Sequence, residues 1–299
     1  FLVAMERDWI VALSRSATIS DEDFQFFLSN TNVAMKQIDL CCKVAAPALS
    51  ALLIPLVSTN DNDIRLACVW IGGANVVSLM AEYICTARVY RMIPELACKD
   101  SCAILLDPEL TETTTETVLT TPVTKHSSSW LPSGLHIYMQ QSSWLGGLGL
   151  AMLYTNSLTF GNGIMEGYLL FRGLKLEFVG ILRGIAAAIG LLGTFAYHIS
   201  VKHMSLERTG LWSIVFECTC LALALVSMGI VNNAIALGLL ITGVSLSRIG
   251  LWVFDIAITQ LQQQEIPEHI RGQVGGVQQS LNAGFNLLAF CVGILFPDP

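Results

Sequence analysis

The chain has 299 residues, of which 53% are hydrophobic and only 13% are charged, and its formal net charge is −7. Soluble domains carry charged residues about twice as often, so the composition argues against an ordinary soluble enzyme or nucleic-acid-binding protein. Segments of about 20 apolar residues, long enough to cross a bilayer, recur along the chain. We therefore predict an all-α, polytopic membrane protein with spans at residues 33–57, 66–89, 144–171, 176–200, 210–230, 233–259 and 273–296.

The two ends of the sequence favour a piece of a longer, transporter-like chain. The first residue is Phe1, inside an apolar helix end, and the last is Pro299, just after another predicted span. The alternative is a complete seven-helix receptor. Receptors of that class have loops of more even length than this chain has.

Polar residues form a stripe along the first predicted span. Asn32, Lys36, Asp39 and Lys43 recur at i, i+4, i+7 and i+11, which is one face of a helix. Ionisable groups at membrane depth are costly and usually face a cavity or a partner. Lys36 and Asp39 could also neutralise each other as an i, i+3 pair. The alternative is that this end of the helix simply protrudes into the cytoplasm.

A hydrophilic insertion follows the second predicted span. Residues 94–136 include a Thr/Ser-rich stretch, Thr111–Ser129, that is typical of a disordered linker. We expect it to separate an N-terminal helical lobe, residues 1–93, from a C-terminal lobe, residues 137–299. The excess of Lys and Arg beside several spans places the linker in the cytoplasm, although Arg172 and Lys175 oppose that orientation.

The third predicted span contains a candidate helix break. Gly161 and Gly163 flank Asn162 in the middle of the apolar run, and Glu166 lies one turn further on. Each glycine weakens a helix by about 1 kcal/mol, and broken helices in transporters expose backbone groups to the substrate. Close packing of small residues against another helix is the competing explanation.

Charged and amide residues also occur in the last two predicted spans. Arg248 and Asp255 lie seven residues apart, which on a helix is two turns and about 10 Å, so each needs its own partner. One face of the final span carries Arg271, Gly275, Gln278, Asn282 and Asn286. Such a stripe favours a water-lined pathway, but amides also hold membrane helices together.

Signatures of catalysis or of a metal cage are absent from the sequence. None of the five histidines has HxxxH or HExxH spacing, and most of the nine cysteines lie within predicted spans. The chain contains no P-loop, no GxSxG motif and no dinucleotide-binding glycine pattern. We therefore expect neither an enzyme nor a bound cofactor. Arg183 and Glu217 are isolated charges in other spans, and the sequence pattern assigns no role to either.

Several segments resemble the ferroportin iron exporters. They are MERDWIV (Met5–Val11), NVAMKQIDL (Asn32–Leu40), SRIGLWVFDIAITQLQQQ (Ser247–Gln264) and RGQVGGVQQSLN (Arg271–Asn282). The resemblance implies a twelve-helix major-facilitator fold with two lobes, of which this chain would cover the end of helix 4 to helix 11. It also implies a monomeric exporter of Fe²⁺, or of Ni²⁺ or Co²⁺, that acts by alternating access without ATP in a plasma or vacuolar/organellar membrane. The plant and protist members are the closer match.

In that family, charged residues of these motifs form a gate between the lobes on the cytoplasmic side. Carried over to this sequence, the gate would consist of Asp8, Asn32, Lys36 and Asp39 from the N-terminal lobe and Arg248, Asp255, Arg271 and Gln278 from the C-terminal lobe. Lys36 stands where the family usually has arginine, so a bidentate contact would be lost while the charge remains.

The metal site of the animal exporters is only partly matched. Their acidic, cysteine and histidine ligands fall near Gly161, Asn162 and Ala289, and Asn286 replaces an acidic residue. The resemblance then implies an oxygen-rich metal site drawn from Asn162, Glu166, Asn282 and Asn286, with weak ligands for Fe²⁺. Two rival functions stay open: a major-facilitator carrier of an organic solute, and a non-transporting receptor or paralogue.

Overall fold

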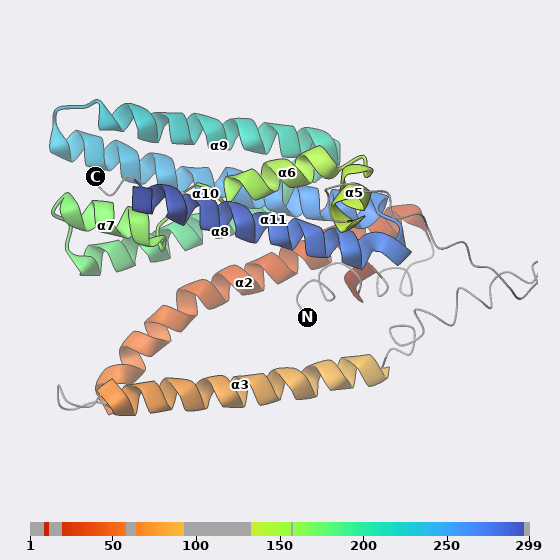
Figure 1. Ribbon diagram of the computed structural model, residues 1–299, viewed down its shortest axis with the longest axis horizontal. Helices are drawn as coiled ribbons and strands as arrows, with labels where there is room; N and C mark the ends of the chain where they lie inside the picture. Colours follow the sequence, from red (N-terminus) through yellow and green to blue (C-terminus); the bar gives the residue numbers. More distant parts are fainter. Residues whose placement is uncertain (1–8, 12–19, 58–63, 93–132, 157, 296–299) are drawn as a thin grey trace, which may run out of the picture. The chain divides into compact units, whose positions relative to one another are not determined.

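The computed structural model describes residues 9–11, 20–57, 64–92, 133–156 and 158–295, and in these residues all regular secondary structure is helical. The helices are α2 (Asp21–Val57), α3 (Ile64–Met92), α5 (Ser133–Met139), α6 (Trp144–Leu153), α7 (Gly163–Phe171), α8 (Leu176–His203), α9 (Leu206–Met228), α10 (Asn233–Glu265) and α11 (Glu268–Leu295) (Figure 1). The predicted all-helical fold is therefore confirmed.

The chain divides into two compact units. The first comprises Phe1–Ala48 and Ser133–Pro299, and the second comprises Leu49–Pro132. The first part of α2 thus packs with the C-terminal helices, while α3 belongs to the second unit. Most of the predicted linker, residues 94–132, lies outside the described residues, and its last four residues belong to α5.

Helix α2 begins earlier than the apolar run alone predicts. The backbone N–H of Asp23 donates to Ser20 Oγ at 3.2 Å, which satisfies one of the free donors at the helix start. Asp21, Glu22 and Asp23 occupy the first turn, where negative charge is favourable. A polar turn therefore extends this helix beyond its apolar part.

The third predicted span is broken, as the glycine-rich sequence indicated. Helix α6 ends at Leu153 and α7 begins at Gly163. Gly161 adopts a positive φ of 97°, a backbone conformation that residues with a side chain rarely tolerate. Asn162 then caps α7, because its Oδ1 accepts a hydrogen bond from the Ile164 N–H at 3.0 Å. One glycine and one capping amide thus create the break.

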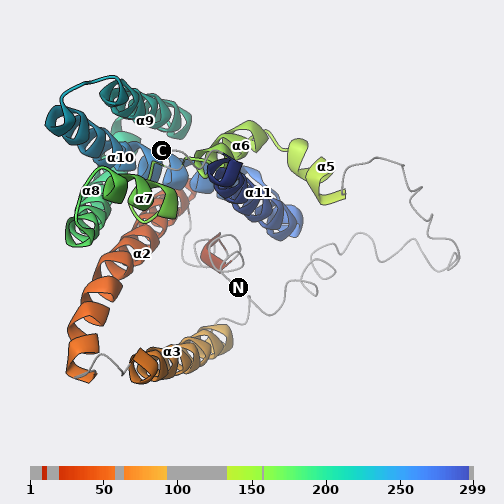
Figure 2. The same ribbon diagram turned by 60° about the vertical axis from the view of Figure 1, so that its left-hand side comes forward.

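Helix α10 lies at the centre of the first unit and packs against α9, α8 and α6. Figures 1 and 2 show α9 and α10 side by side and antiparallel. Two glycines allow the close approach: a Cβ at Gly243 would lie 2.7 Å from the Cys220 carbonyl oxygen, and one at Gly250 would lie 2.6 Å from that of Ser213. Small residues at such positions are typical of helix contacts in membranes.

Four described helical segments are long and apolar enough to cross a membrane: Val69–Met92, Phe178–His203, Leu206–Met228 and Asn233–Glu265. On α8 and α9, large apolar side chains such as Ile181, Phe195 and Val215 are more than half exposed. Water would not favour such surfaces, whereas lipid does. Helices α2 and α11 carry polar stripes, and the third predicted span is interrupted, which lowers the hydropathy or length of those segments.

Candidate functional site

An ion pair joins α2 to α10. Lys36 Nζ lies 2.7 Å from Asp255 Oδ2, and the two side chains are 20% and 9% exposed. The same two helices also share a buried apolar cluster, to which Val33 of α2, Tyr197 of α8 and Val253 of α10 contribute. Asp255 therefore has the partner that its burial requires, and this partner comes from the helix that carries the first polar stripe.

Amide side chains also join the two helices nearer the start of α2. Together with the Lys36–Asp255 ion pair, these contacts form what we call the α2–α10 seam. Asn32 Nδ2 donates to Gln263 Oε1 at 2.6 Å, and Gln263 Nε2 donates back to Asn32 Oδ1 at 3.2 Å. Gln264 donates to the exposed Gln25, about two turns nearer the start of α2. The Asn32–Gln263 contacts satisfy buried polar groups on both helices, so α2 and α10 are held by an ion pair and several directional hydrogen bonds.

Asp39 takes a different partner from the one that its spacing to Lys36 suggested. Its Oδ2 accepts from Lys43 Nζ at 2.6 Å within α2, and both side chains are about half exposed. Lys36 and Lys43 both lie over the ring of Trp252, at 5.5 and 5.1 Å from its centroid. Since Lys36 turns toward α10, the i, i+3 pair with Asp39 does not form.

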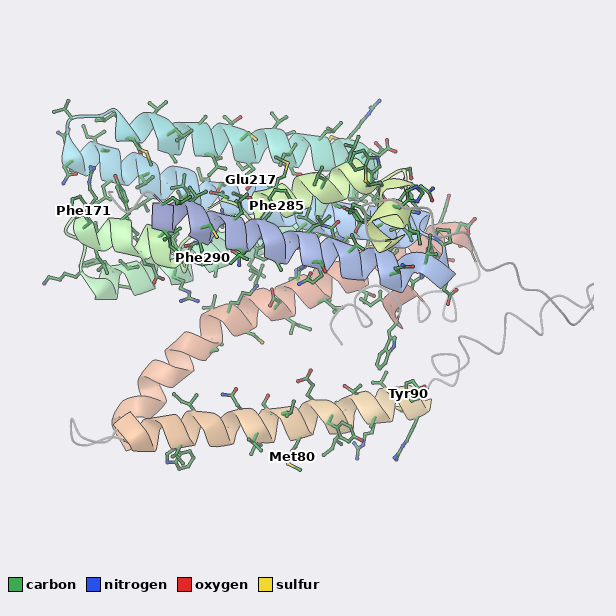
Figure 3. The ribbon with its side chains drawn as sticks, in the orientation of Figure 1. Met80, Tyr90, Phe171, Glu217, Phe285 and Phe290 are labelled. Atoms are coloured by element: carbon green, nitrogen blue, oxygen red, sulfur yellow. The ribbon has the colours of Figure 1, made fainter. Side chains whose placement is uncertain are left out.

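Arg248 is buried beside α9. Its residue surface is 7% exposed, and its Nη2 donates to the neighbouring Ser247 Oγ at 3.3 Å. Glu217 of α9, labelled in Figure 3, is fully buried and interacts electrostatically with Arg248. No ion pair within 4.0 Å joins the two among the described residues. Sequence spacing does not link Glu217 with Arg248, because the two residues lie on different helices.

Gln278 and Arg271 of the last helix are both buried within the C-terminal helices. Gln278 accepts from Tyr138 Oη at 2.7 Å and from Gln262 Nε2 at 3.1 Å. It donates to the Gly147 carbonyl oxygen and to Asn282 Oδ1, each at 2.9 Å. Arg271 Nη2 donates to the Ile266 carbonyl oxygen at 3.0 Å. The printed sequence alone would not have revealed Tyr138 or Gln262 as partners of this stripe.

Replacing Gln278 by leucine should destabilise the protein by more than about 2 kcal/mol, because several buried polar groups would each lose a hydrogen bond. Thermal unfolding of the purified protein in detergent would measure the loss. The neighbouring Gln279 is exposed, so Gln279→Leu is the matched control and should leave the unfolding temperature within a degree or two. Equal shifts for the two variants would contradict the network.

A cavity of about 470 Å³ lies between the helix break and helices α2, α8, α10 and α11. Lys43, Arg183, Arg248 and Asp255 line it, together with the amides Asn156, Asn162 and Asn286. Phe290, labelled in Figure 3, contributes to the apolar wall. The cavity is thus lined by the helix break, two of the predicted gate residues and three asparagine side chains.

The four residues predicted to bind metal do not lie together around the cavity. Asn162 and Asn286 line the cavity, whereas Asn282 takes part in the Gln278 network. Glu166 lies in the first turn of α7 and does not line the cavity. No cluster of three His, Cys, Asp or Glu side chains that could hold a metal ion occurs among the described residues. Asp8 lies outside the part of the chain that the structure describes.

Comparisons with known proteins agree on one family. A family model described as Ferroportin1 (FPN1) matches residues 2–299. The chain is 32% identical to solute carrier family 40 member 1 of rice over 99% of its own length and 59% of the relative's. Against human ferroportin, identity is 27% over 99% of this chain and 64% of that protein. The chain thus spans about three fifths of the length of the curated relatives it matches.

A solved structure shows the same fold. It is the crystal structure of a bacterial homologue of the iron transporter ferroportin in an outward-facing state. The TM-score is 0.71 at 22% sequence identity, and the match covers 99% of this chain and 62% of that one.

Proposed function

Since this chain belongs to the ferroportin family and is a multi-pass membrane protein, we propose that it exports iron(II), or a related divalent metal such as nickel or cobalt, by alternating access. The observation that carries the proposal is the Lys36–Asp255 ion pair between α2 and α10. In a two-lobed transporter, α2 would belong to one lobe and α10 to the other. A bond between them is then a gate.

Because the pair is largely buried, it would be either closed and paired or open and hydrated in the proposed transport cycle. Removing one partner of a buried ion pair costs on the order of 3 kcal/mol, because it leaves the other charge without compensation. Separating the helices requires that both charges be rehydrated, as they would be when the cytoplasmic side opens to water. Closure restores the pair, so the ion pair favours one of the two states that alternating access needs.

The amide contacts between Asn32 and Gln263 would fix how α2 aligns along α10 when the gate closes. Asn32 and Gln263 pair in both directions, and this geometry is lost if either helix shifts by one residue. Asp39 and Arg248 flank this seam, while Arg271 and Gln278 brace the C-terminal helices behind it. In this proposal, the first pair moves with the gate and the second pair keeps its lobe rigid.

Metal binding in this proposal uses oxygen donors. The side chains of Asn162 and Asn286 line the cavity, although Asn162 Oδ1 also accepts from the Ile164 N–H, and Glu166 and Asn282 would need to move to join them. Such ligands bind Fe²⁺ weakly, which suits a carrier that must release its cargo. Support for metal comes from the relatives: their names are ferroportin and solute carrier family 40, and one bacterial homologue was solved with soaked iron.

Transport by the intact protein tests the proposal. Reconstituted into liposomes loaded with a metal-sensitive dye, it should move Fe²⁺, Co²⁺ or Ni²⁺ at least tenfold faster than protein-free liposomes. Flux of none of these metals, with a correctly folded protein, would reject metal export and favour the organic-solute carrier. That rival is supported by the ligand-sized cavity and its basic lining.

A further inference from the structure

The cavity between the helix break and α10 is much larger than a metal ion needs. Its volume is about 470 Å³, and sites for small organic ligands typically span about 300 to 1,000 Å³. A bare divalent cation would fill a small part of it and leave the rest to water. The size of the cavity therefore points to a multi-atom ligand.

The charge of the lining favours an anion. Among the described residues of the lining, Lys43, Arg183 and Arg248 are basic and Asp255 is the single carboxylate. That carboxylate is already bound by Lys36. Lys43 binds Asp39 and Glu217 balances Arg248, so among these described residues Arg183 is the cation of the lining that no carboxylate compensates. No histidine or cysteine occurs among the described residues that line the cavity. A bare metal ion would thus meet cations and amides, with no free carboxylate to compensate its charge.

Arg183 brings a guanidinium beside the helix break. It makes no ion pair or hydrogen bond to any other described residue, and it lines the cavity from α8. A Cβ built on Gly161 would lie 3.0 Å from Arg183 Nε, so the absence of a side chain at Gly161 leaves room for the guanidinium. Its donors are free to bind a ligand.

Arg248 approaches from the opposite helix with unused donors. The residue is 7% exposed, and its Nε is buried without a hydrogen-bond partner. A buried donor without an acceptor is costly, so an anion in the cavity that accepts from the Arg248 guanidinium would be favoured. Glu217 lies on the α9 side and balances the charge without occupying Nε.

The start of α7 adds a third favourable feature. Asn162 and Gly161 both line the cavity, and α7 begins at Gly163. The N-terminal end of a helix carries a partial positive charge and binds anions. Asn162 Oδ1 already accepts from the Ile164 N–H, and a Cβ at Gly163 would meet nothing within 4 Å, so other side chains do not cover the Gly163 backbone.

From these features we infer that the cavity binds a small anion with several carboxylate groups through Arg183, Arg248 and the start of α7. Guanidinium groups bind carboxylates through two parallel hydrogen bonds, and two arginines can hold two carboxylates of one molecule. If the protein exports a divalent metal as proposed above, the transported species is the metal bound to this anion. The metal then crosses this lobe as an anionic carboxylate complex, and the protein holds the anion.

Binding to the purified intact protein tests the inference, with citrate as the probe. Isothermal titration calorimetry would be run with citrate alone, Co²⁺ alone, and the Co²⁺–citrate complex. We expect citrate and its complex to bind, and Co²⁺ alone to bind at least tenfold more weakly than the complex. Arg183→Gln should weaken citrate binding at least tenfold. Its side chain is exposed, so this variant should fold normally.

Two further variants sharpen the test. Arg248→Gln should weaken citrate binding by a similar factor, whereas Arg172→Gln should not change it. Arg172 is a matched arginine of the same unit that binds Tyr168 and Asn233 instead of lining the cavity. Citrate affinity unchanged in Arg183→Gln, or Co²⁺ alone binding as tightly as the complex, would overturn the inference.

The outcome is separable from that of the proposed function. Citrate binding that depends on Arg183, with no metal flux in liposomes, would support the anion site while rejecting metal export. Metal flux that is equal with and without citrate, in a protein that does not bind citrate, would support export and reject the anion site.

Discussion

Reversing the charge of Asp255 should reduce metal transport by the intact protein at least tenfold. In Asp255→Lys, two ammonium groups would face each other where an ion pair of 2.7 Å now closes the seam. Like charges in a partly buried site repel strongly because little solvent screens them, so the closed state would be lost. Metal flux into dye-loaded liposomes measures the effect.

The reciprocal exchange provides the stronger test. Lys36→Asp alone should also reduce transport at least tenfold. The double variant Lys36→Asp with Asp255→Lys should regain a measurable part of it, because the ion pair returns with its polarity reversed. Glu207→Lys, at an exposed position in the first turn of α9, controls for adding a lysine. If metal flux through the double variant is no higher than through either single variant, the two residues act separately. That result would reject the proposed gate.

Substituting Gly250 by alanine should destabilise the protein by about 2–3 kcal/mol, since overpacking at a rigid contact outweighs the better helix propensity of alanine. The new Cβ would lie 2.6 Å from the Ser213 carbonyl oxygen and 3.0 Å from the Glu217 backbone nitrogen. Backbone atoms cannot rotate away as a side chain can, so α9 and α10 would have to separate.

Gly238→Ala is the control for this change on the same helix. A Cβ there would meet nothing within 4 Å, so the substitution should be neutral or stabilising by up to about 1 kcal/mol. Unfolding temperatures of both variants in the same detergent give the comparison. Equal stability of the two variants would show that α9 and α10 do not approach each other as closely as the structure has them.

The helix break illustrates what local sequence can predict. Gly161, Asn162 and Gly163 indicated a break because the chemistry is local: a positive φ favours glycine, and an asparagine side chain can cap the helix that follows. The predicted break is present, and the structure adds how it is made: φ is 97° at Gly161, and Asn162 Oδ1 accepts from the Ile164 N–H. No distant residue was needed to infer this feature.

The partner of Lys36 illustrates the opposite case. Spacing along α2 allowed Asp39 as its partner, whereas the family resemblance placed Lys36 in one gate with Asp255, 219 positions away, without pairing the two. Asp39 instead binds Lys43, and Lys36 reaches Asp255. The choice depends on how α2 lies against α10, which is set by side-chain packing between helices that are far apart in sequence.

The apolar periodicity, the breaker residues and the recognisable motifs by themselves determined the helical membrane class, the approximate spans, the broken helix and the family. These are local properties, repeated in each segment, so they can be read without knowing which helices touch. Only the tertiary structure decided that Glu217 lies behind Arg248, that Gln278 binds Tyr138 and Gln262, and that Arg183 faces the helix break. Such contacts depend on helix rotation and crossing geometry, to which distant small residues such as Gly250 contribute, and a rotation of one residue would change every partner.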